Sequence, residues 1–98
     1  MNNSKKYDLE DRTLKYAKDV RSYLKKVPRD VVNIEEIRQC AKSSGSIGAK
    51  YREANESLSK KDFLMRIKIS RRESKETIYW LNLIMCNKDQ ETERDRLI

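Results

Sequence analysis

The segment from Ser59 to Met85, SKKDFLMRIKISRRESKETIYWLNLIM, decides the fold. Ser59 stands where a helix-capping residue is expected, and Asp62 follows three positions later, where a capping box places Glu or Gln. From Phe63 onward, apolar residues recur every three or four positions, as they do on one face of a helix. We therefore predict one long helix that begins at Ser59 and ends near Asn87.

The residues of this helix, placed at intervals of 100°, fall on three faces. The predicted core stripe contains Phe63, Ile67, Ser70, Ser74, Thr77, Leu81 and Met85. Almost directly opposite lie Lys61, Lys68, Arg72 and Lys75, with Lys60 and Arg71 beside them. A third face, between the other two, carries Ile69, Glu73, Glu76, Trp80 and Leu83.

The end of the helix, residues 77–85 (TIYWLNLIM), is apolar almost all round. Such a surface needs cover on more than one side, which three helices do not easily supply. Either a fourth helix that starts within residues 88–98, or another subunit, would provide that cover. We therefore predict a short or truncated fourth helix and an oligomer contact formed by Ile69, Trp80 and Leu83.

Two further amphipathic helices are predicted before this one. The first begins near Asp8 and is stopped by Pro28, because a proline disfavours helix in the residue before it. Its apolar stripe is Thr13, Tyr16, Ala17, Val20, Tyr23, Leu24 and Val27. The second runs from residues 29–31 to about Ser57, with a stripe of Ile34, Ile37, Ala41, Ser44, Gly48, Tyr51, Asn55 and Leu58.

The centre of the second helix, residues 43–49 (SSGSIGA), has the composition of a loop. The helical phase nevertheless matches before and after it, so we predict an uninterrupted helix. Ala41, Gly45 and Ala49 are spaced by four, and small residues on one ridge let a neighbouring backbone approach closely. Gly45 and Gly48 are therefore predicted helix-packing positions, although each costs about 1 kcal/mol of helix propensity.

These elements predict a single all-α domain over residues 1–98, with a flexible segment at residues 1–7. Helices of roughly 40 Å, joined by a residue or two near residues 57–60, must fold back on each other. The predicted architecture is an antiparallel up-down bundle of three long helices with a short or truncated fourth. Intrinsic disorder is the alternative for a chain with 40% charged residues, and the periodicity argues against it.

The net charge of +7 indicates an anionic partner, with nucleic acid preferred over a membrane surface. The alternative is that the chain, like many small proteins, is basic only for solubility. No stretch approaches the roughly 18 uncharged residues that a membrane span needs, and the N-terminus lacks the apolar core of a signal peptide. We therefore expect a cytoplasmic protein.

The sequence offers little of the chemistry that enzymes use. It has no histidine, no phosphate loop and no dinucleotide-binding fingerprint. Cys40 and Cys86 form no CxxC pair, so we expect two buried free thiols and no zinc site. We therefore expect no enzyme: no catalytic residues, no metal, no cofactor and no small-molecule substrate.

Two carboxylates of the third helix, Glu73 and Glu76, are predicted to face a helix interface. An unpaired charge in such a place is costly, so each should have a basic partner. The candidate partners are Arg38, Arg52 and Arg66. We interpret this set as a structural ion-pair network.

The basic strip, defined as Lys60, Lys61, Lys68, Arg71, Arg72 and Lys75, is the candidate nucleic-acid-binding site. A strip without interspersed acid can neutralise several phosphates, with an affinity that depends strongly on salt. A plain solvated helix face is the alternative. No aromatic residue is predicted within the strip, so we expect contacts to the RNA backbone rather than stacking on bases.

Three blocks resemble the bacterial proteins encoded within intervening sequences of 23S ribosomal RNA genes. They are YDLEDRTLKYAKDV (residues 7–20), SSGSIGAKYREANESLSKKDF (residues 43–63) and RIKISRRESKETIYWL (residues 66–81). The resemblance implies a four-helix bundle that assembles into a homopentamer, acts with ribosomal RNA and has no catalytic residues. A related accessory protein of diversity-generating retroelements has the same bundle and binds a reverse transcriptase and nucleic acid, which makes an adaptor without a direct RNA role the alternative. The chain departs from the family where a full fourth helix would continue beyond Ile98.

Overall fold

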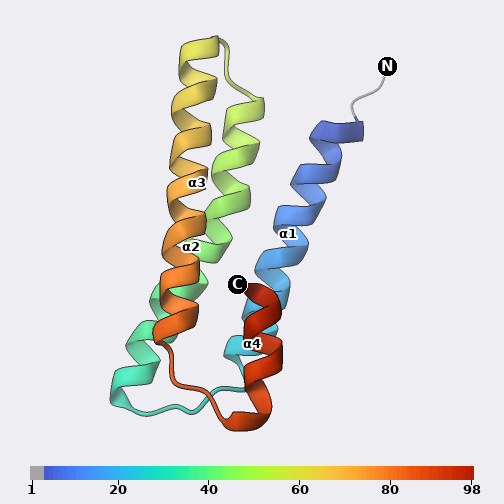
Figure 1. The fold of residues 1–98 in the computed structure, drawn as a ribbon. Coiled ribbons are helices and arrows are strands. Elements are labelled where there is room, and N and C mark those ends of the chain that lie inside the picture. Colours follow the sequence, from blue (N-terminus) through green and yellow to red (C-terminus); the bar gives the residue numbers. More distant parts are fainter. Residues whose placement is uncertain (1–3) are drawn as a thin grey trace.

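The computed structural model describes residues 4–98, which form four α-helices. They are α1 (Ser4–Leu24), α2 (Val31–Asn55), α3 (Lys60–Leu83) and α4 (Glu91–Leu97), and a short 3-10 turn, η1 (Lys88–Gln90), leads into α4. α2 and α3 run antiparallel along each other, and α1 packs on α2 but diverges from it toward its own N-terminus (Figure 1). The predicted class, an antiparallel bundle of three long helices with a short fourth, is confirmed.

The boundaries of the helices follow their capping residues. Ser59 caps α3 as predicted, because its hydroxyl accepts a hydrogen bond of 3.1 Å from the backbone N–H of Asp62. Asp30 caps α2 in the same way. The predicted start of the first helix at Asp8 is wrong, since α1 already begins at Ser4; no proline or glycine interrupts helix there. Residues 1–3 of the segment predicted to be flexible lie outside the described part of the chain.

α3 ends at Leu83 rather than near Asn87. Ile84 turns to extended backbone, with φ −61° and ψ 128°, and the chain then leaves the helix axis. The backbone N–H and carbonyl of Met85 both bond to the side chain of Asn33 in α2, at 2.9 and 2.8 Å. Met85 is therefore exposed and does not belong to the core stripe, contrary to prediction.

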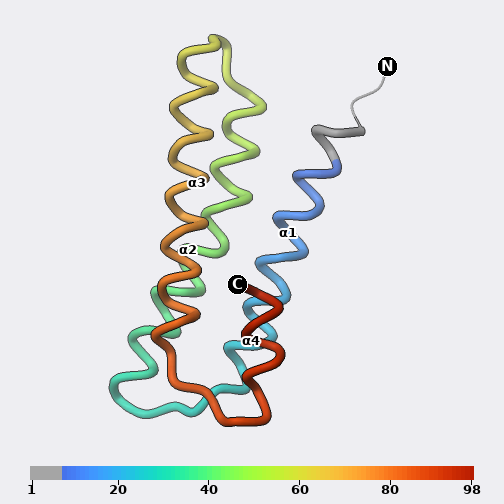
Figure 2. Tube along the Cα trace, viewed as in Figure 1, coloured from blue at the N-terminus to red at the C-terminus, as the bar shows by residue number. Residues whose placement is uncertain are grey.

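The short fourth helix folds back against α1 (Figure 2). The hydroxyl of Tyr16 donates a hydrogen bond of 2.7 Å to the carbonyl of Leu97, and Gln90 donates one of 2.6 Å to the carbonyl of Lys26. The ammonium of Lys26 also lies 2.9 Å from the carboxylate of Glu93. These contacts bring Leu97 into the core.

The hydrophobic core lies at the end of the bundle where the α1–α2 and α3–α4 connections run. It contains Val20, Tyr23, Leu24, Val27, Cys40, Leu81, Ile84 and Leu97. Toward the other end, small polar side chains fill the α2–α3 interface: Ser43 and Thr77 share a buried hydrogen bond of 2.8 Å. The predicted α1 stripe is buried or half-buried throughout. Of the predicted α2 stripe, Ile34, Ala41 and Leu58 are exposed, and Leu58 lies beyond the end of the helix.

The two glycines of α2 occupy different environments, although the helix is continuous through residues 43–49 as predicted. A Cβ at buried Gly48 would lie 2.9 Å from Oγ1 and 3.2 Å from Cβ of Thr13, so α1 crosses α2 at this point. Around Gly45, no described atom outside the adjoining turns of α2 lies within 4 Å of such a Cβ. The prediction that Gly45 lets a neighbouring helix approach is therefore wrong within this chain, because its ridge faces solvent.

We expect Gly45→Ala to raise the free energy of unfolding by about 1 kcal/mol, through helix propensity alone. Gly48→Ala should lower it by about 1 kcal/mol, because the overlap with Thr13 outweighs the same gain in propensity. Urea unfolding followed by circular dichroism measures both. Adding Thr13→Ala to Gly48→Ala should recover part of the loss, whereas equal gains at both glycines would contradict the close contact with α1.

Candidate nucleic-acid interface

The basic strip lies on the solvent face of α3, and all six of its side chains are exposed. Lys68, Arg71, Arg72 and Lys75 come together around a shallow depression of about 300 Å³. Lys60 and Lys61 lie apart from these four, in the first turn of the helix at its N-terminal end. Among the ion pairs of residues 8–98, none involves a member of the strip, so its positive charge is not neutralised within this part of the chain.

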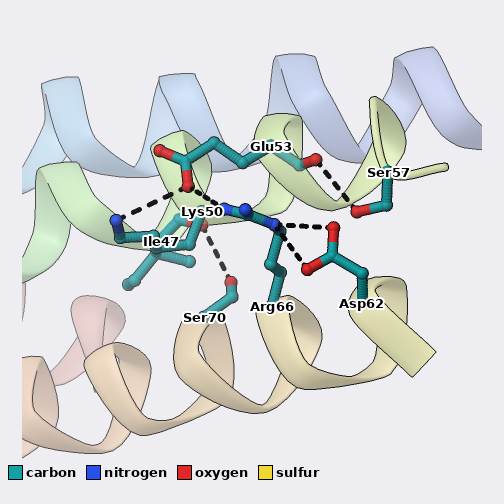
Figure 3. Close-up of polar contacts among 7 residues, drawn as sticks. All are labelled: Ile47, Lys50, Glu53, Ser57, Asp62, Arg66 and Ser70. Atoms are coloured by element: carbon teal, nitrogen blue, oxygen red, sulfur yellow. Dashed lines mark hydrogen bonds and ion pairs between the residues drawn. The ribbon is translucent and has the colours of Figure 1, made fainter. Parts of the chain in front are cut away.

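The acidic residues nearest the start of α3 pair elsewhere, as Figure 3 shows. Arg66 bridges the two helices, with its guanidinium 3.1 Å from Asp62 and 2.7 Å from Glu53 of α2. Hydrogen bonds from Arg66 hold the pKa of Asp62 below its ordinary value. In the same close-up, the hydroxyl of Ser70 donates a hydrogen bond of 2.8 Å to the carbonyl of Ile47. These contacts hold α3 on α2 and leave its opposite face to the cations.

The predicted ion-pair partners of Glu73 and Glu76 are wrong. Each candidate arginine pairs with a different carboxylate: Arg66 with Asp62 and Glu53, Arg52 with Glu10, and Arg38 with Glu35. Glu76 is exposed to water and needs no protein partner, and Glu73 is half-buried. No ion pair of either glutamate occurs within residues 8–98.

The three predicted oligomer contacts are not equally accessible. Ile69 and Trp80 are half-buried, and Trp80 packs against the core cluster that Leu97 completes. Leu83 is 46% exposed and lines a depression of about 470 Å³. Val31 and Val32, which the predicted stripes left out, line it too and are 90% and 67% exposed. The apolar stripes could not reveal these two valines, because they lie outside the core-facing positions of α2.

Two further side chains beside the strip are apolar. Leu64 and Met65 are about half exposed and line, with Lys61 and Lys68, a depression of about 490 Å³.

Tyr79 is 59% exposed. It lies one turn beyond Lys75 and about 20° from Lys68 around the helix. The prediction concerned the strip itself, whose six members include no aromatic residue. Tyr79 is a neighbour of the strip, and the spacing of four from Lys75 was the signal that could have revealed it.

The remaining chemistry is sparse in the described part of the chain. Both cysteines are free, and desolvation raises the pKa of buried Cys40 to about 12. Cys86 is only half-buried, so the expectation of two buried thiols is wrong for it. Within the described residues, no cluster of three or more histidine, cysteine or acidic side chains is placed to hold a metal ion. None of the described helices is both long and apolar enough to cross a membrane.

Together, the helices and their surfaces define a small all-α bundle that carries a dense basic strip, without ion pairs to residues 8–98, on one helix. The chain belongs to the 23S rRNA-intervening sequence protein family, whose model matches residues 5–94. It is also similar to a crystal structure of a protein of unknown function from the S23 ribosomal protein family of Bacteroides thetaiotaomicron. The two chains are 27% identical, with a TM-score of 0.72 over 95% of this chain and 88% of the other. No curated protein matches the chain significantly.

Proposed function

We propose that the protein is a non-enzymatic, self-associating RNA-binding protein of the cytoplasm. Its target is structured RNA, with ribosomal RNA as the first candidate. It binds the phosphates through the basic strip of α3 and reads little sequence. The names of the family and of the structural neighbour, which refer to 23S rRNA and to a ribosomal protein, support the choice of ribosomal RNA.

The observation that carries this proposal is the spacing of the unpaired cations. Lys68 precedes Arg72 by four positions, Arg71 precedes Lys75 by four, and no acid of residues 8–98 pairs with them. Like charges at this spacing destabilise a helix by about 0.2–0.5 kcal/mol per pair. An arrangement that costs stability and contributes nothing to packing is typical of a binding surface, where phosphates offset the repulsion.

Fluorescence anisotropy of a labelled 23S ribosomal RNA fragment at two salt concentrations tests the proposal. If four to six cations contact phosphates, the logarithm of the association constant should fall with the logarithm of salt at a slope of about −3 to −5. The affinity should then fall about 60-fold to about 1,000-fold between about 50 and about 200 mM salt. No binding at low salt, or binding indifferent to salt, would contradict it.

The proposed self-association is supported by the exposed apolar side chains around Leu83. Val31, Val32 and Met85 lie beside it, and together they surround one depression at the end of the bundle. Apolar surface of this kind commonly marks a protein contact. The resemblance stated above makes a homopentamer the specific expectation, and light scattering of the purified chain measures it. A strict monomer at all concentrations would exclude self-association.

An adaptor for a nucleic-acid enzyme, such as a reverse transcriptase, is the second candidate function. The depression that Leu64 and Met65 line within the strip favours it, because pure phosphate contacts need no apolar side chains. An adaptor would keep its protein partner when Lys68 and Arg72 are reversed to glutamate and lose it when Leu64 becomes serine.

A further inference from the structure

Tyr79 is an aromatic side chain set at the end of a row of cations. It lies on the outer face of α3, one helical turn beyond Lys75 and two turns beyond Arg72. Its side chain is 59% exposed, so most of it is accessible to a ligand. Its ring meets the ring of Trp80 edge to face, with centroids 5.1 Å apart and planes at 75°. Because Trp80 is itself packed against the core, this contact restrains the tyrosine ring.

We propose that Tyr79 stacks on an unpaired base of the RNA whose phosphates lie on the basic strip. The preferred ligand is then a duplex RNA that carries a single-stranded nucleotide beside its paired region. This inference rests on the proposed function and adds to it which kind of structured RNA is bound.

The chemistry of the two parts of the surface leads to this ligand. Cations alone recognise the backbone of a duplex, whose bases are stacked and offer no free ring face. An exposed aromatic ring binds a base only where that base is unstacked. Lys75 and Tyr79 are separated by about 6 Å along the helix axis. A phosphate on Lys75 therefore leaves a base of the same or the next nucleotide within reach of the tyrosine ring.

A contact between subunits is the other use that Tyr79 could have, because exposed Leu83 lies one turn farther along α3. Charge argues against it. A second copy seated on Tyr79 would approach Arg72 and Lys75, which lack an acidic partner within residues 8–98. The head-to-tail contact of a ring would therefore need an acidic surface on the neighbouring copy, and a two-fold contact would bring the same cations of both copies together. Like charges brought together at an interface are strongly unfavourable. RNA supplies the opposite charge at the same place.

The test compares two fluorescein-labelled RNAs, a blunt-ended duplex and the same duplex with an overhang of unpaired adenosines. We expect the protein to bind the overhang RNA about tenfold more tightly, as one stacked base would give. Tyr79→Ala should lose that preference and keep the affinity for the blunt duplex. Tyr79→Phe, which retains the ring, should keep both. Leu14→Ala, which removes an exposed apolar side chain of α1, is the control and should also keep both. Circular dichroism checks that each variant is folded.

Fluorescence of Trp80, the single tryptophan of the chain, gives a second readout. A base that stacks on Tyr79 comes close to the indole, so the overhang RNA should change the emission more than the blunt duplex does. This difference should vanish in Tyr79→Ala. Equal affinity of the unmodified protein for the two RNAs, or equal losses for both in Tyr79→Ala, would overturn the inference and leave phosphate binding standing.

Two other results would also overturn it. If Tyr79→Ala changes the mass measured by light scattering but not the preference between the RNAs, Tyr79 belongs to a subunit contact. If the unmodified protein binds neither RNA at low salt, the proposed function and this inference fall together. A changed mass with an unchanged preference would contradict only the role of Tyr79, because RNA binding through the basic strip would be intact.

Discussion

Reversing two charges of the basic strip, Lys68→Glu together with Arg72→Glu, is expected to weaken RNA binding about 100-fold at low salt. Each lost phosphate contact also removes the release of about one counterion, so the salt slope should shrink by about 2. The loss should be similar for different RNA sequences, because contacts to the backbone carry no sequence information. Anisotropy titrations at several salt concentrations measure both quantities.

The matched control reverses two cations of α1, Lys18→Glu together with Arg21→Glu. These residues are exposed and have no ion pair within residues 8–98, so the control changes the net charge by the same amount at a different place. The affinity of this control variant for RNA should fall far less. The free energy of unfolding of both double variants should stay within about 0.5 kcal/mol of that of the unmodified protein. Equal losses of affinity in the two variants would mean that only the overall charge matters and that α3 carries no site.

Which residues of α3 belong to the basic strip and which are buried was predictable, because both sets follow from the period of one helix. Ser59 marks the start of α3 by a local hydrogen bond, and the 3.6-residue period then assigns a face to every later residue. Lys68 and Arg72 were placed on the solvent face in this way, opposite buried Thr77. The same period places Tyr79 beside the cations, but its apolar neighbours led us to count it with a surface in need of cover.

The end of α3 could not be predicted from local sequence. Neither proline nor glycine stands near Leu83, and residues 84–86 continue the apolar run. The helix ends because a side chain from another helix, Asn33, captures the backbone of Met85. The partners of Arg52 and Arg66 were missed for a related reason. A periodic pattern gives the face of a residue, but not which residue of a neighbouring helix lies at the same height.

That long-range capture leads to the largest expected effect on stability, which is at Asn33. Its side chain is 2% exposed and joins two connections of the bundle. Its amide nitrogen donates to the carbonyls of Pro28 and Met85, each at 2.8 Å, and its oxygen accepts from the N–H of Met85 at 2.9 Å. The amide thus fixes the α1–α2 connection against the point where the chain leaves α3.

We expect Asn33→Ala to lower the free energy of unfolding by about 3 kcal/mol, because three backbone groups beside a buried site lose their partner. That is a large fraction of the about 5–15 kcal/mol that stabilises a typical domain. Urea unfolding measures it, and hydrogen exchange at the amide of Met85 should accelerate. Asn82→Ala is the control, since within residues 8–98 the exposed side chain of Asn82 bonds only to Ile78 of its own helix, and its loss should change stability by less than about 0.5 kcal/mol. Similar effects at the two asparagines would contradict the role of Asn33.

Asn33→Asp separates the loss of hydrogen bonds from the loss of side-chain volume, because the two side chains have nearly the same shape. An ionised carboxylate would face the carbonyl oxygens of Pro28 and Met85, so the pKa of the introduced carboxyl should be higher in the folded than in the unfolded protein. A group of this kind adds its stabilisation below its unfolded pKa of about 4 and loses it as the pH rises through the folded value. The deficit of Asn33→Asp relative to the unmodified protein should therefore be largest at neutral pH and shrink toward pH of about 4, whereas the deficit of Asn33→Ala should not change in that way. A deficit of Asn33→Asp that stays constant with pH would mean that the two carbonyls do not depend on the donors of Asn33.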